Sequence, residues 1–300
     1  MKILFVCQQY IHSSRWINQL KDTHHEIFVF DCLDREVHPD LEWVHYFGNW
    51  AKRKRKYIKG EDFIKKTSPK FYDAISPKLK VTASEKLIEI IKEIQPDLVH
   101  SLEMQSETYP LIKVRKKLDF RWAYFCWGSD LFLYQNDSYH RPKIQKVLSK
   151  LDYLFTDNSR DISLAESHGF KGESFSNLPG GGGYNLNTIQ KHYKEFEERE
   201  YILIKGYENW AGRSLYVLQA LELIIDTIRE YKIYVYSAHD VVIEKIQELN
   251  SKYNLTIEYS SRHKEIQQEE LLEKFGNSVI AIGNSITDGI PNTLLEAIIL

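Results

Sequence analysis

The chain has 300 residues, of which 43% are hydrophobic and 27% charged, and its formal net charge at pH 7 is −2. This composition is typical of globular proteins, and a length about twice that of one domain predicts two domains with separate cores. The near-neutral charge argues against a general nucleic-acid-binding protein. Cys7, Cys32 and Cys126 lack CxxC spacing, so we expect small buried side chains in a reducing compartment rather than a zinc site.

The first half of the chain alternates short apolar runs with segments of helical periodicity. The apolar runs predict strands at residues 3–7, 26–30, 97–100, 122–126 and 153–156. Residues 83–94 predict a helix, because their apolar side chains recur at the spacing of one helix face. Strands and helices in this alternation are typical of βαβ units with a parallel sheet.

A proline and four consecutive glycines at residues 179–183 interrupt this alternation. It resumes with predicted strands at residues 201–205, 232–236, 256–259 and 278–282. Four glycines in a row do not form the interior of a strand or helix. We therefore predict an N-terminal domain at 1–179, a hinge at 180–200 and a C-terminal domain at 201–300. The alternative for the glycines is an ordinary flexible surface loop.

The segment 283–299 reads as a turn and the start of a helix, with Asp288 and Glu296 on either side of the turn. Asn292 and Thr293 are residue types that favour helix N-caps. A helix N-terminus attracts anions through its free N–H groups and positive dipole end, while a nearby carboxylate accepts hydrogen bonds from sugar hydroxyls. The segment therefore predicts a site for a nucleotide diphosphate and its ribose.

The two ends of the chain lead to further expectations. The chain ends at Leu300 inside the predicted helix, with neither a glycine C-cap nor a polar tail, so we expect an incomplete C-terminal domain and a fragment of a longer protein. The apolar run at residues 3–7 is too short for a signal peptide, and no stretch reaches the ~20 apolar residues of a membrane span. These features predict a cytoplasmic protein.

Five segments in the same order resemble motifs of the retaining group 1 (family four) GT-B glycosyltransferases. They are residues 95–100, 127–130, 152–159, 177–180 and 288–296, the last being similar to the family's Glu-x7-Glu motif with Asp in first place. The resemblance implies an α/β fold of the GT-B type, with two Rossmann-like doubly wound parallel-sheet domains and an interdomain cleft. It also implies that the N-terminal domain binds the acceptor and the C-terminal domain binds the nucleotide-sugar.

The resemblance assigns donor-site roles to the C-terminal motif. Glu296 would bind the ribose hydroxyls, Asp288 would face the transferred sugar, and the backbone at Pro291, Asn292 and Thr293 would hold the diphosphate.

The resemblance also requires cations beside the diphosphate, because the leaving group carries negative charge. Where the family has an arginine, this chain has Tyr207. We therefore take Arg213 as the first candidate catalytic cation and Lys205 as the second. The alternative is that Arg213 only decorates a surface helix.

The acceptor side departs further from the family pattern. The Gly-rich loop after the first strand is absent, and His12 and Arg15 are the candidate contacts in its place. Trp127 occupies the position of a family histidine, so we consider Glu103 as a catalytic substitute and His100 as an acceptor contact, with purely structural roles as the alternative. Asp130 either orients the acceptor or forms an Asx-turn.

Metal and membrane contacts follow from what the chain contains. It has no Asp-x-Asp motif to hold a divalent ion, so we predict metal-independent transfer without a cofactor. Residues 52–59 contain six Lys or Arg, with aromatic side chains close by. Such a segment predicts contact with an anionic membrane surface, although a solvated basic segment has the same composition.

These observations lead to the hypothesis of a hexosyltransferase that moves a sugar from a nucleotide-sugar to a glycan or lipid-linked acceptor with retention. Cell-surface polysaccharide synthesis is the expected role. Two alternatives stay open at this point. One is a sugar-nucleotide epimerase of the same architecture, and the other is a degenerate transferase that acts as a scaffold and binds no nucleotide. A Rossmann dehydrogenase is disfavoured because no GxGxxG follows the first strand.

Overall fold

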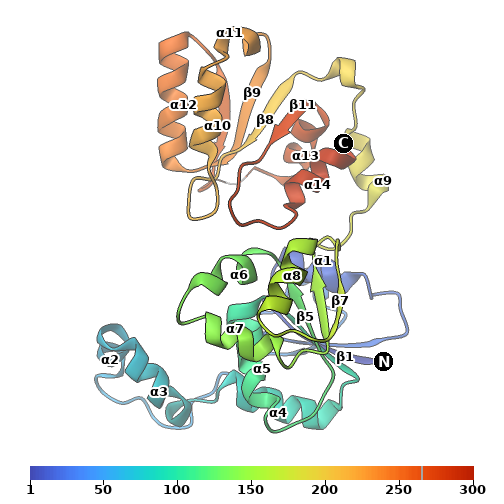
Figure 1. The fold of residues 1–300 in the computed structure, drawn as a ribbon, viewed down its shortest axis with the longest axis vertical. Helices are drawn as coiled ribbons and strands as arrows, with labels where there is room; N and C mark the ends of the chain where they lie inside the picture. The colour runs from blue at the N-terminus through green and yellow to red at the C-terminus, as the bar shows by residue number, and fades with distance from the viewer. Residues whose placement is uncertain (265) are drawn as a thin grey trace. The chain divides into compact units, whose positions relative to one another are not determined.

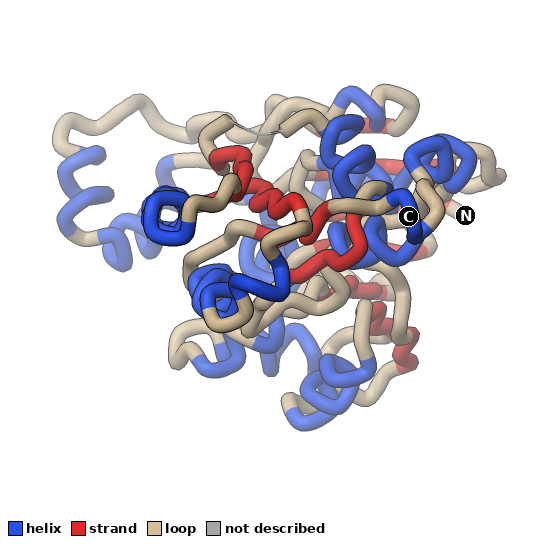
Figure 2. Tube along the Cα trace, turned by 90° about the horizontal axis from the view of Figure 1, so that it is seen from above, coloured by secondary structure: helices blue, strands red, loops and turns tan. Residues whose placement is uncertain are grey.

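The computed structural model describes residues 1–264 and 266–300 and divides into two compact units (Figure 1). Unit 1 is Met1–Gly183 and unit 2 is Tyr184–Leu300. Each unit is built on its own parallel sheet, and Figure 2 shows the strands of these sheets in red among the blue helices. The α/β fold with two parallel sheets that the sequence predicts is therefore confirmed.

Unit 1, which the structure describes throughout, contains a seven-stranded parallel sheet with the order β3-β2-β1-β4-β5-β6-β7. Its strands are β1 (Lys2–Val6), β2 (Glu26–Phe30), β3 (His45–Phe47), β4 (Leu98–Leu102), β5 (Trp122–Cys126), β6 (Tyr153–Thr156) and β7 (Glu173–Phe175). Its helices are α1 (Ile11–Asn18), α2 (Glu61–Thr67), α3 (Pro69–Leu79), α4 (Ala83–Ile94), α5 (Tyr109–Val114), α6 (Ser129–Phe132), α7 (Arg141–Leu148) and α8 (Ser159–Ser167). Short turns of helix lie at Pro39–Leu41, Met104–Thr108 and Tyr134–Asn136.

Both faces of this sheet are buried, which explains why its strands read as continuous apolar runs. Along β1, Leu4 and Val6 pack into one core together with α4, α5 and α7. Ile3 and Phe5 point to the opposite face, into a second core with α1. Because successive side chains of a strand point to opposite faces, β1 contributes to both cores.

Helix α4 shows how local sequence sets an element. Thr82 accepts a hydrogen bond from the Glu85 N–H, and the Glu85 carboxylate accepts one from the Thr82 N–H, which forms a capping box. Its buried face contains four apolar side chains, Leu87, Ile90, Ile91 and Ile94. The predicted helix at 83–94 is confirmed to the residue.

In unit 2, the described residues form a four-stranded parallel sheet with the order β10-β9-β8-β11. The strands are β8 (Tyr201–Lys205), β9 (Lys232–Ala238), β10 (Ile257–Ser261) and β11 (Ser278–Ile282). The helices are α9 (Leu186–Ile189), α10 (Ser214–Glu222), α11 (Ile225–Ile228), α12 (Asp240–Tyr253), α13 (Gln268–Gly276) and α14 (Asn292–Ile299), with short turns at Gln190–His192 and Phe196–Glu198. Helices α10 and α12 cover one face, and α13 packs on the other.

The segment between the last strand of unit 1 and the first of unit 2 has contacts at both ends, each within the unit to which that end belongs. Gly182 has a φ of +76°, and a Cβ there would lie 2.6 Å from the Arg15 carbonyl carbon of α1. Beyond it, the Tyr184 hydroxyl donates to the Asn292 carbonyl within unit 2 at 3.1 Å. Residues 184–200 accordingly group with unit 2.

Two details of the sequence analysis differ from the structure. The three-residue strands β3 and β7 were not expected, and each lies at an edge of the sheet where only one neighbour pairs with it. The expectation that Asn292 and Thr293 act as N-caps is wrong. Pro291 takes the N-cap position of α14, with a φ of −63° and ψ of 135°, so both residues lie in the first helical turn.

Candidate active site

The carboxyl edge of the unit 2 sheet brings the loops after β8 and β11 together, because these strands are neighbours. Lys205 is the last residue of β8, and Asp288 lies in the loop after β11. The Lys205 Nζ atom is 3.4 Å from the Asp288 Oδ2 atom, and both side chains are partly shielded, with exposed fractions of 17% and 32%. Two of the predicted site residues therefore form an ion pair at this edge.

A cavity of about 60 Å³ lies beside this pair within unit 2. Residues from β8, β9, β11, α13 and the start of α14 line it: Lys205, Tyr236, Phe275, residues 281–285, Asp288, Pro291, Thr293 and Leu294. It thus joins four predicted site residues, two of which carry charge. Arg213, Asn292 and Glu296 are not among its lining residues.

Two loops are fixed to each other beside the cavity by backbone hydrogen bonds. The Ile286 N–H donates to the Ala211 carbonyl at 2.9 Å, and the Arg213 N–H donates to the Asn284 carbonyl at 3.0 Å. The Arg213 guanidinium donates to the carbonyls of Asn209 and Gly212 in its own loop. In this conformation Arg213 stabilises the loop, and Lys205 is the cation that lines the cavity.

The first turn of α14 faces the cavity through Pro291 and Thr293. No side chain caps this end of the helix. The N–H groups of the first turn and the positive end of the helix dipole are suited to an anion. The local chemistry therefore fits a phosphate next to the Lys205 ammonium group.

Glu296 lies one turn further along α14 and is only 3% exposed. Its Oε1 atom accepts a hydrogen bond from the Gln268 Nε2 atom of α13 at 3.0 Å. This contact ties α14 to α13. The predicted contact of Glu296 with a ribose stays a prediction.

Sequence analysis missed a cluster around Tyr207, the residue that replaces the family's arginine. The Lys205 Nζ atom and the Arg262 Cζ atom each lie 4.6 Å from the centre of its ring, and the His239 ring stacks on it at 5.8 Å. Tyr207, His239 and Arg262 follow β8, β9 and β10, so only the pairing of the strands brings them together. The negative face of an aromatic ring attracts a cation, so the Tyr207 ring favours the positive charges of Lys205 and Arg262 near it. Arg262 had no motif that could have revealed it.

In unit 1, the strand order reverses between the central strands β1 and β4, and ligands of open α/β sheets bind at such a switch point. Gln8 follows β1, and its Nε2 atom donates to the Ser106 hydroxyl at 2.7 Å. Glu103 follows β4 with a φ of 73°, a strained value for a residue with a side chain. Its carboxylate accepts from the N–H groups of Gln105 and Ser106, so it holds this turn in place.

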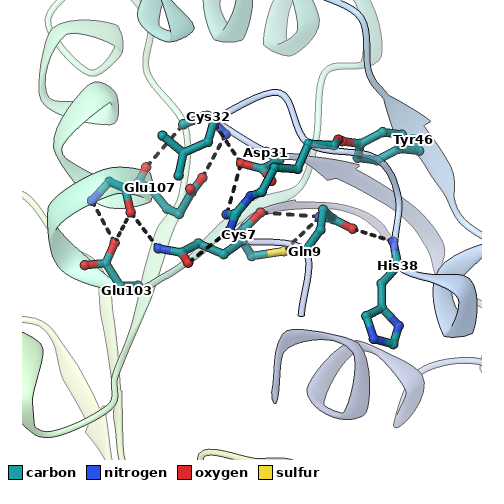
Figure 3. A network of polar contacts seen from close by, with 12 residues as sticks. Cys7, Gln9, Asp31, Cys32, His38, Tyr46, Glu103 and Glu107 are labelled. Carbon is teal, nitrogen blue, oxygen red and sulfur yellow. Dashed lines mark hydrogen bonds and ion pairs between the residues drawn. The ribbon is translucent and has the colours of Figure 1, made fainter. Parts of the chain in front are cut away.

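Figure 3 shows a polar network next to this turn. Asp31 is fully buried and forms an ion pair with Arg35 at 2.8 Å. Glu107 is also fully buried, and its Oε2 atom accepts from the Cys32 N–H at 2.9 Å. Burial, followed by the negative charge of Asp31, raises the pKa of Glu107 to about 8. We therefore expect a protonated Glu107 at neutral pH.

The predicted acceptor residues lie in different surroundings. His12 and Arg15 are half-buried on α1, and the His12 ring meets the Trp127 ring edge-on at 6.2 Å. His100 lies within β4 between Phe5 and Phe155, and burial lowers its pKa to about 3. It therefore stays neutral and lines an apolar cavity of about 240 Å³ between the sheet and α1.

Asp130 is 6% exposed and stabilises the turn after β5. It accepts hydrogen bonds from the N–H groups of Trp127 and Met104 and from the Tyr124 hydroxyl. Burial raises its pKa to about 7. None of these bonds is that of an Asx-turn, in which the carboxylate would accept from the N–H two residues further on. Contact of Asp130 with an acceptor stays a prediction.

Two absences concern residues 1–264 and 266–300, the part of the chain that the structure describes. Within these ranges, no three His, Cys, Asp or Glu side chains are grouped as metal ligands would be. Nor does any helix there have the length and apolar character needed to cross a bilayer. Metal independence stays a prediction.

Comparison with known proteins decides the family. Residues 2–158 match the sequence family described as glycosyl transferase 4-like, which is more than half of the chain. The chain belongs to this glycosyltransferase family. The resemblance to group 1 GT-B glycosyltransferases that the sequence motifs indicated is therefore confirmed. No curated protein sequence matches the chain significantly.

Solved structures of the same fold include members of two enzyme classes. A lipopolysaccharide outer core galactosyltransferase, WaaB, is 16% identical, with a TM-score of 0.63 over 100% of this chain and 78% of its own. A glycosyltransferase from Rickettsia africae is 13% identical, with a TM-score of 0.65 and coverage of 99% and 76%. A UDP-GlcNAc 2-epimerase from Methanocaldococcus jannaschii is 14% identical, with a TM-score of 0.54 and coverage of 100% and 81%. At these identities the likeness establishes the GT-B fold of this glycosyl transferase 4-like chain.

Proposed function

We propose that this protein transfers a hexose from a nucleotide-diphosphate-sugar to a glycan or lipid-linked acceptor with retention of configuration, in the synthesis of a cell-surface polysaccharide. The observation that carries the proposal is the Lys205–Asp288 pair, which lines one cavity with the uncapped start of α14. A cation, a carboxylate and the N-terminal end of a helix dipole at one place suit a charged diphosphate joined to a sugar.

In the proposed reaction, the bond between the sugar C1 and the diphosphate oxygen breaks, a bond from C1 to an acceptor hydroxyl oxygen forms, and the proton of that hydroxyl passes to the departing diphosphate oxygen. Negative charge grows on the leaving diphosphate as the sugar gains oxocarbenium character. The Lys205 ammonium group and the N–H groups of the first turn of α14 stabilise that charge, which is the largest contribution that fixed groups make in such reactions. Asp288 faces the sugar, and the acceptor binds at unit 1.

Protein cations supply the positive charge that the donor diphosphate requires. The donor diphosphate is stabilised by protein cations alone, so transfer proceeds without a divalent metal. The Tyr207 ring keeps the cations of Lys205 and Arg262 near each other, each 4.6 Å from the ring centre. Arg262 supplies positive charge in place of the arginine that Tyr207 replaces.

The donor site is tested by thermal-shift titration with UDP, GDP, TDP, CMP and NAD on the wild type and on Lys205→Ala. A ligand at a hundred times its dissociation constant stabilises by roughly 2.7 kcal/mol. We expect one diphosphate to stabilise the wild type and to lose most of that effect in Lys205→Ala. Lys232→Ala is the matched control, because Lys232 begins β9 at the opposite edge of the same sheet. A protein that no diphosphate stabilises would be the degenerate scaffold.

Product analysis separates transfer from epimerisation, since solved structures of both enzyme classes share the fold. With the nucleotide-sugar that binds, we expect a new glycosidic bond whose anomeric configuration equals that of the donor, measured by proton NMR with EDTA present. An inverted anomer would contradict retention. An epimerised nucleotide-sugar without acceptor consumption would identify the epimerase alternative.

A further inference from the structure

Residues 52–80 form an excursion from unit 1 that is closed at its base. The Val81 N–H donates to the Lys52 carbonyl at 2.9 Å, and the Lys54 N–H donates to the Leu79 carbonyl at 2.8 Å. Helices α2 and α3 pack on each other beyond this base. Figure 1 shows them standing away from the unit 1 sheet, and they are the helices at the far left of Figure 2. We call residues 52–80 the basic hairpin.

The basic hairpin carries a charge opposite to that of the rest of the chain. It contains eleven Lys or Arg residues and three Asp or Glu residues, while the chain as a whole has a net charge of −2. Two of these cations act within the hairpin and at its base, because Arg53 pairs with the buried Glu61 at 2.7 Å and Lys54 pairs with Glu85 at 2.7 Å. Seven other cations with described side chains are exposed and form no described ion pair: Lys52, Arg55, Lys56, Lys59, Lys65, Lys66 and Lys78.

The basic hairpin also exposes large apolar side chains among these cations. The exposed fraction is 70% for Phe63 and 57% for Phe71, and Tyr57 and Ile58 in the preceding loop are at least half exposed. Scattered apolar residues are ordinary on a surface, but four such residues within fifteen positions form a group. Apolar side chains gain free energy when they leave water, so burial of these four against another apolar surface would be favourable.

Helical spacing places cations next to these apolar side chains. Phe63 and Lys66 are three residues apart on α2, which puts them on the same helix face. On α3, Phe71, Ile75 and Lys78 follow one another at spacings of four and three residues. Apolar groups bordered by long basic side chains enter the boundary between acyl chains and headgroups, while the cations remain at lipid phosphates.

We propose that the basic hairpin docks this protein on an anionic phospholipid bilayer, with Phe63 and Phe71 inserted and the surrounding lysines on the headgroups. Charge complementarity selects the anionic surface, because the excess of cations is confined to the hairpin. The exposed phenylalanines favour a bilayer over a soluble polyanion such as RNA, which offers no apolar layer to receive them. This inference does not depend on the donor site in unit 2.

The test is co-sedimentation of the full chain with vesicles of phosphatidylcholine alone and of phosphatidylcholine and phosphatidylglycerol in equal parts. We expect binding only to the mixed vesicles, weakened by added salt. The double variant Phe63→Ser/Phe71→Ser should lower the partition coefficient by about tenfold or more, and Lys65→Gln/Lys66→Gln by a similar factor. Phe63→Trp, which keeps an apolar ring, should bind as well as the wild type.

Matched controls lie outside the basic hairpin. Leu223→Ser removes a side chain that is 87% exposed, and Lys150→Gln/Lys171→Gln removes two exposed lysines of unit 1. We expect both to bind vesicles as the wild type does, and circular dichroism should show that every variant is folded. The proposal is overturned if the wild type fails to sediment with the mixed vesicles. It is also overturned if Phe63→Ser/Phe71→Ser binds unchanged, because the hairpin would then act as a polyanion site only.

Discussion

At the scale of single residues, the structure changes the order of the candidate cations. The family resemblance placed Arg213 first and Lys205 second, because Tyr207 stands at the family's arginine position and the next arginine follows Gly212. In the fold, the Arg213 guanidinium is occupied by the carbonyls of Asn209 and Gly212, whereas the Lys205 ammonium group lines the cavity beside Asp288. The direction of the backbone at the end of β8 determines which cation lines the cavity. The spacing of residues along the chain does not reveal that direction.

A prediction at this scale concerns the carboxyl group of Glu107. Its folded pKa of about 8 lies above the unfolded value of about 4.3, so the folded chain binds a proton that the unfolded chain has released between these values. The stability that the proton contributes is complete below about pH 4.3 and is lost as the pH rises through about 8. Glu107→Gln removes this titration.

The measurement is urea unfolding of the wild type and Glu107→Gln at several pH values. We expect the unfolding free energy of the wild type, relative to the variant, to fall between about pH 5 and pH 8. Glu93→Gln, on the exposed side of α4, controls for the loss of one carboxylate. A difference between wild type and Glu107→Gln that does not change with pH would contradict the buried carboxyl pair.

At the scale of elements, glycines at the carboxyl edge of the unit 2 sheet allow the loops to lie against neighbouring strands. A Cβ at Gly206 would lie 2.6 Å from the Ala238 Cα atom and 2.9 Å from the Tyr236 carbonyl oxygen. Both are backbone atoms of β9, and the Gly206 N–H donates to that same carbonyl at 2.8 Å. The end of β8 is therefore tied to β9 at the point where Lys205 enters the cavity.

We predict that Gly206→Ala lowers the unfolding free energy by about 1–3 kcal/mol. The added methyl group would clash with backbone atoms of β9, and these atoms can move away only if the two strands separate. Gly283→Ala is the control, since a Cβ there would meet no atom within 4 Å, and its effect should stay within about 0.5 kcal/mol. Differential scanning calorimetry of both variants measures this. Equal stability of Gly206→Ala and the wild type would show that the β8–β9 junction is looser than described.

At the scale of the whole molecule, the chain is two units with separate cores, and the candidate donor site lies entirely in unit 2. We predict that the diphosphate identified by thermal shift slows amide hydrogen exchange at residues 206–213 and 283–293. Residues 52–80 should exchange equally fast with and without it, and should slow only when anionic vesicles are added. If the diphosphate slowed exchange in residues 1–183 and left the loops of unit 2 unchanged, the nucleotide site would lie in unit 1 and the prediction would be wrong.

The sequence by itself determined the fold class, the two-sheet organisation and nine of the eleven described strands. Buried parallel strands are apolar on both faces, so runs such as residues 3–7 and 201–205 are visible without tertiary information. The bounds of helix α4 were predicted to the residue, because its capping box and its apolar face both arise from residues close together in the sequence. The short edge strands β3 and β7 were missed, since three residues with one paired neighbour leave no pattern.

Only the tertiary structure decided which side chains meet. Arg262, His239 and Tyr207 follow three different strands, so the order of the sheet creates their cluster. The raised pKa of Glu107 depends on burial next to Asp31, which lies in another loop. Contacts and desolvation arise between segments far apart in sequence, whereas periodicity and capping arise within one segment. The sequence therefore determined the elements, and the fold determined the chemistry of the site.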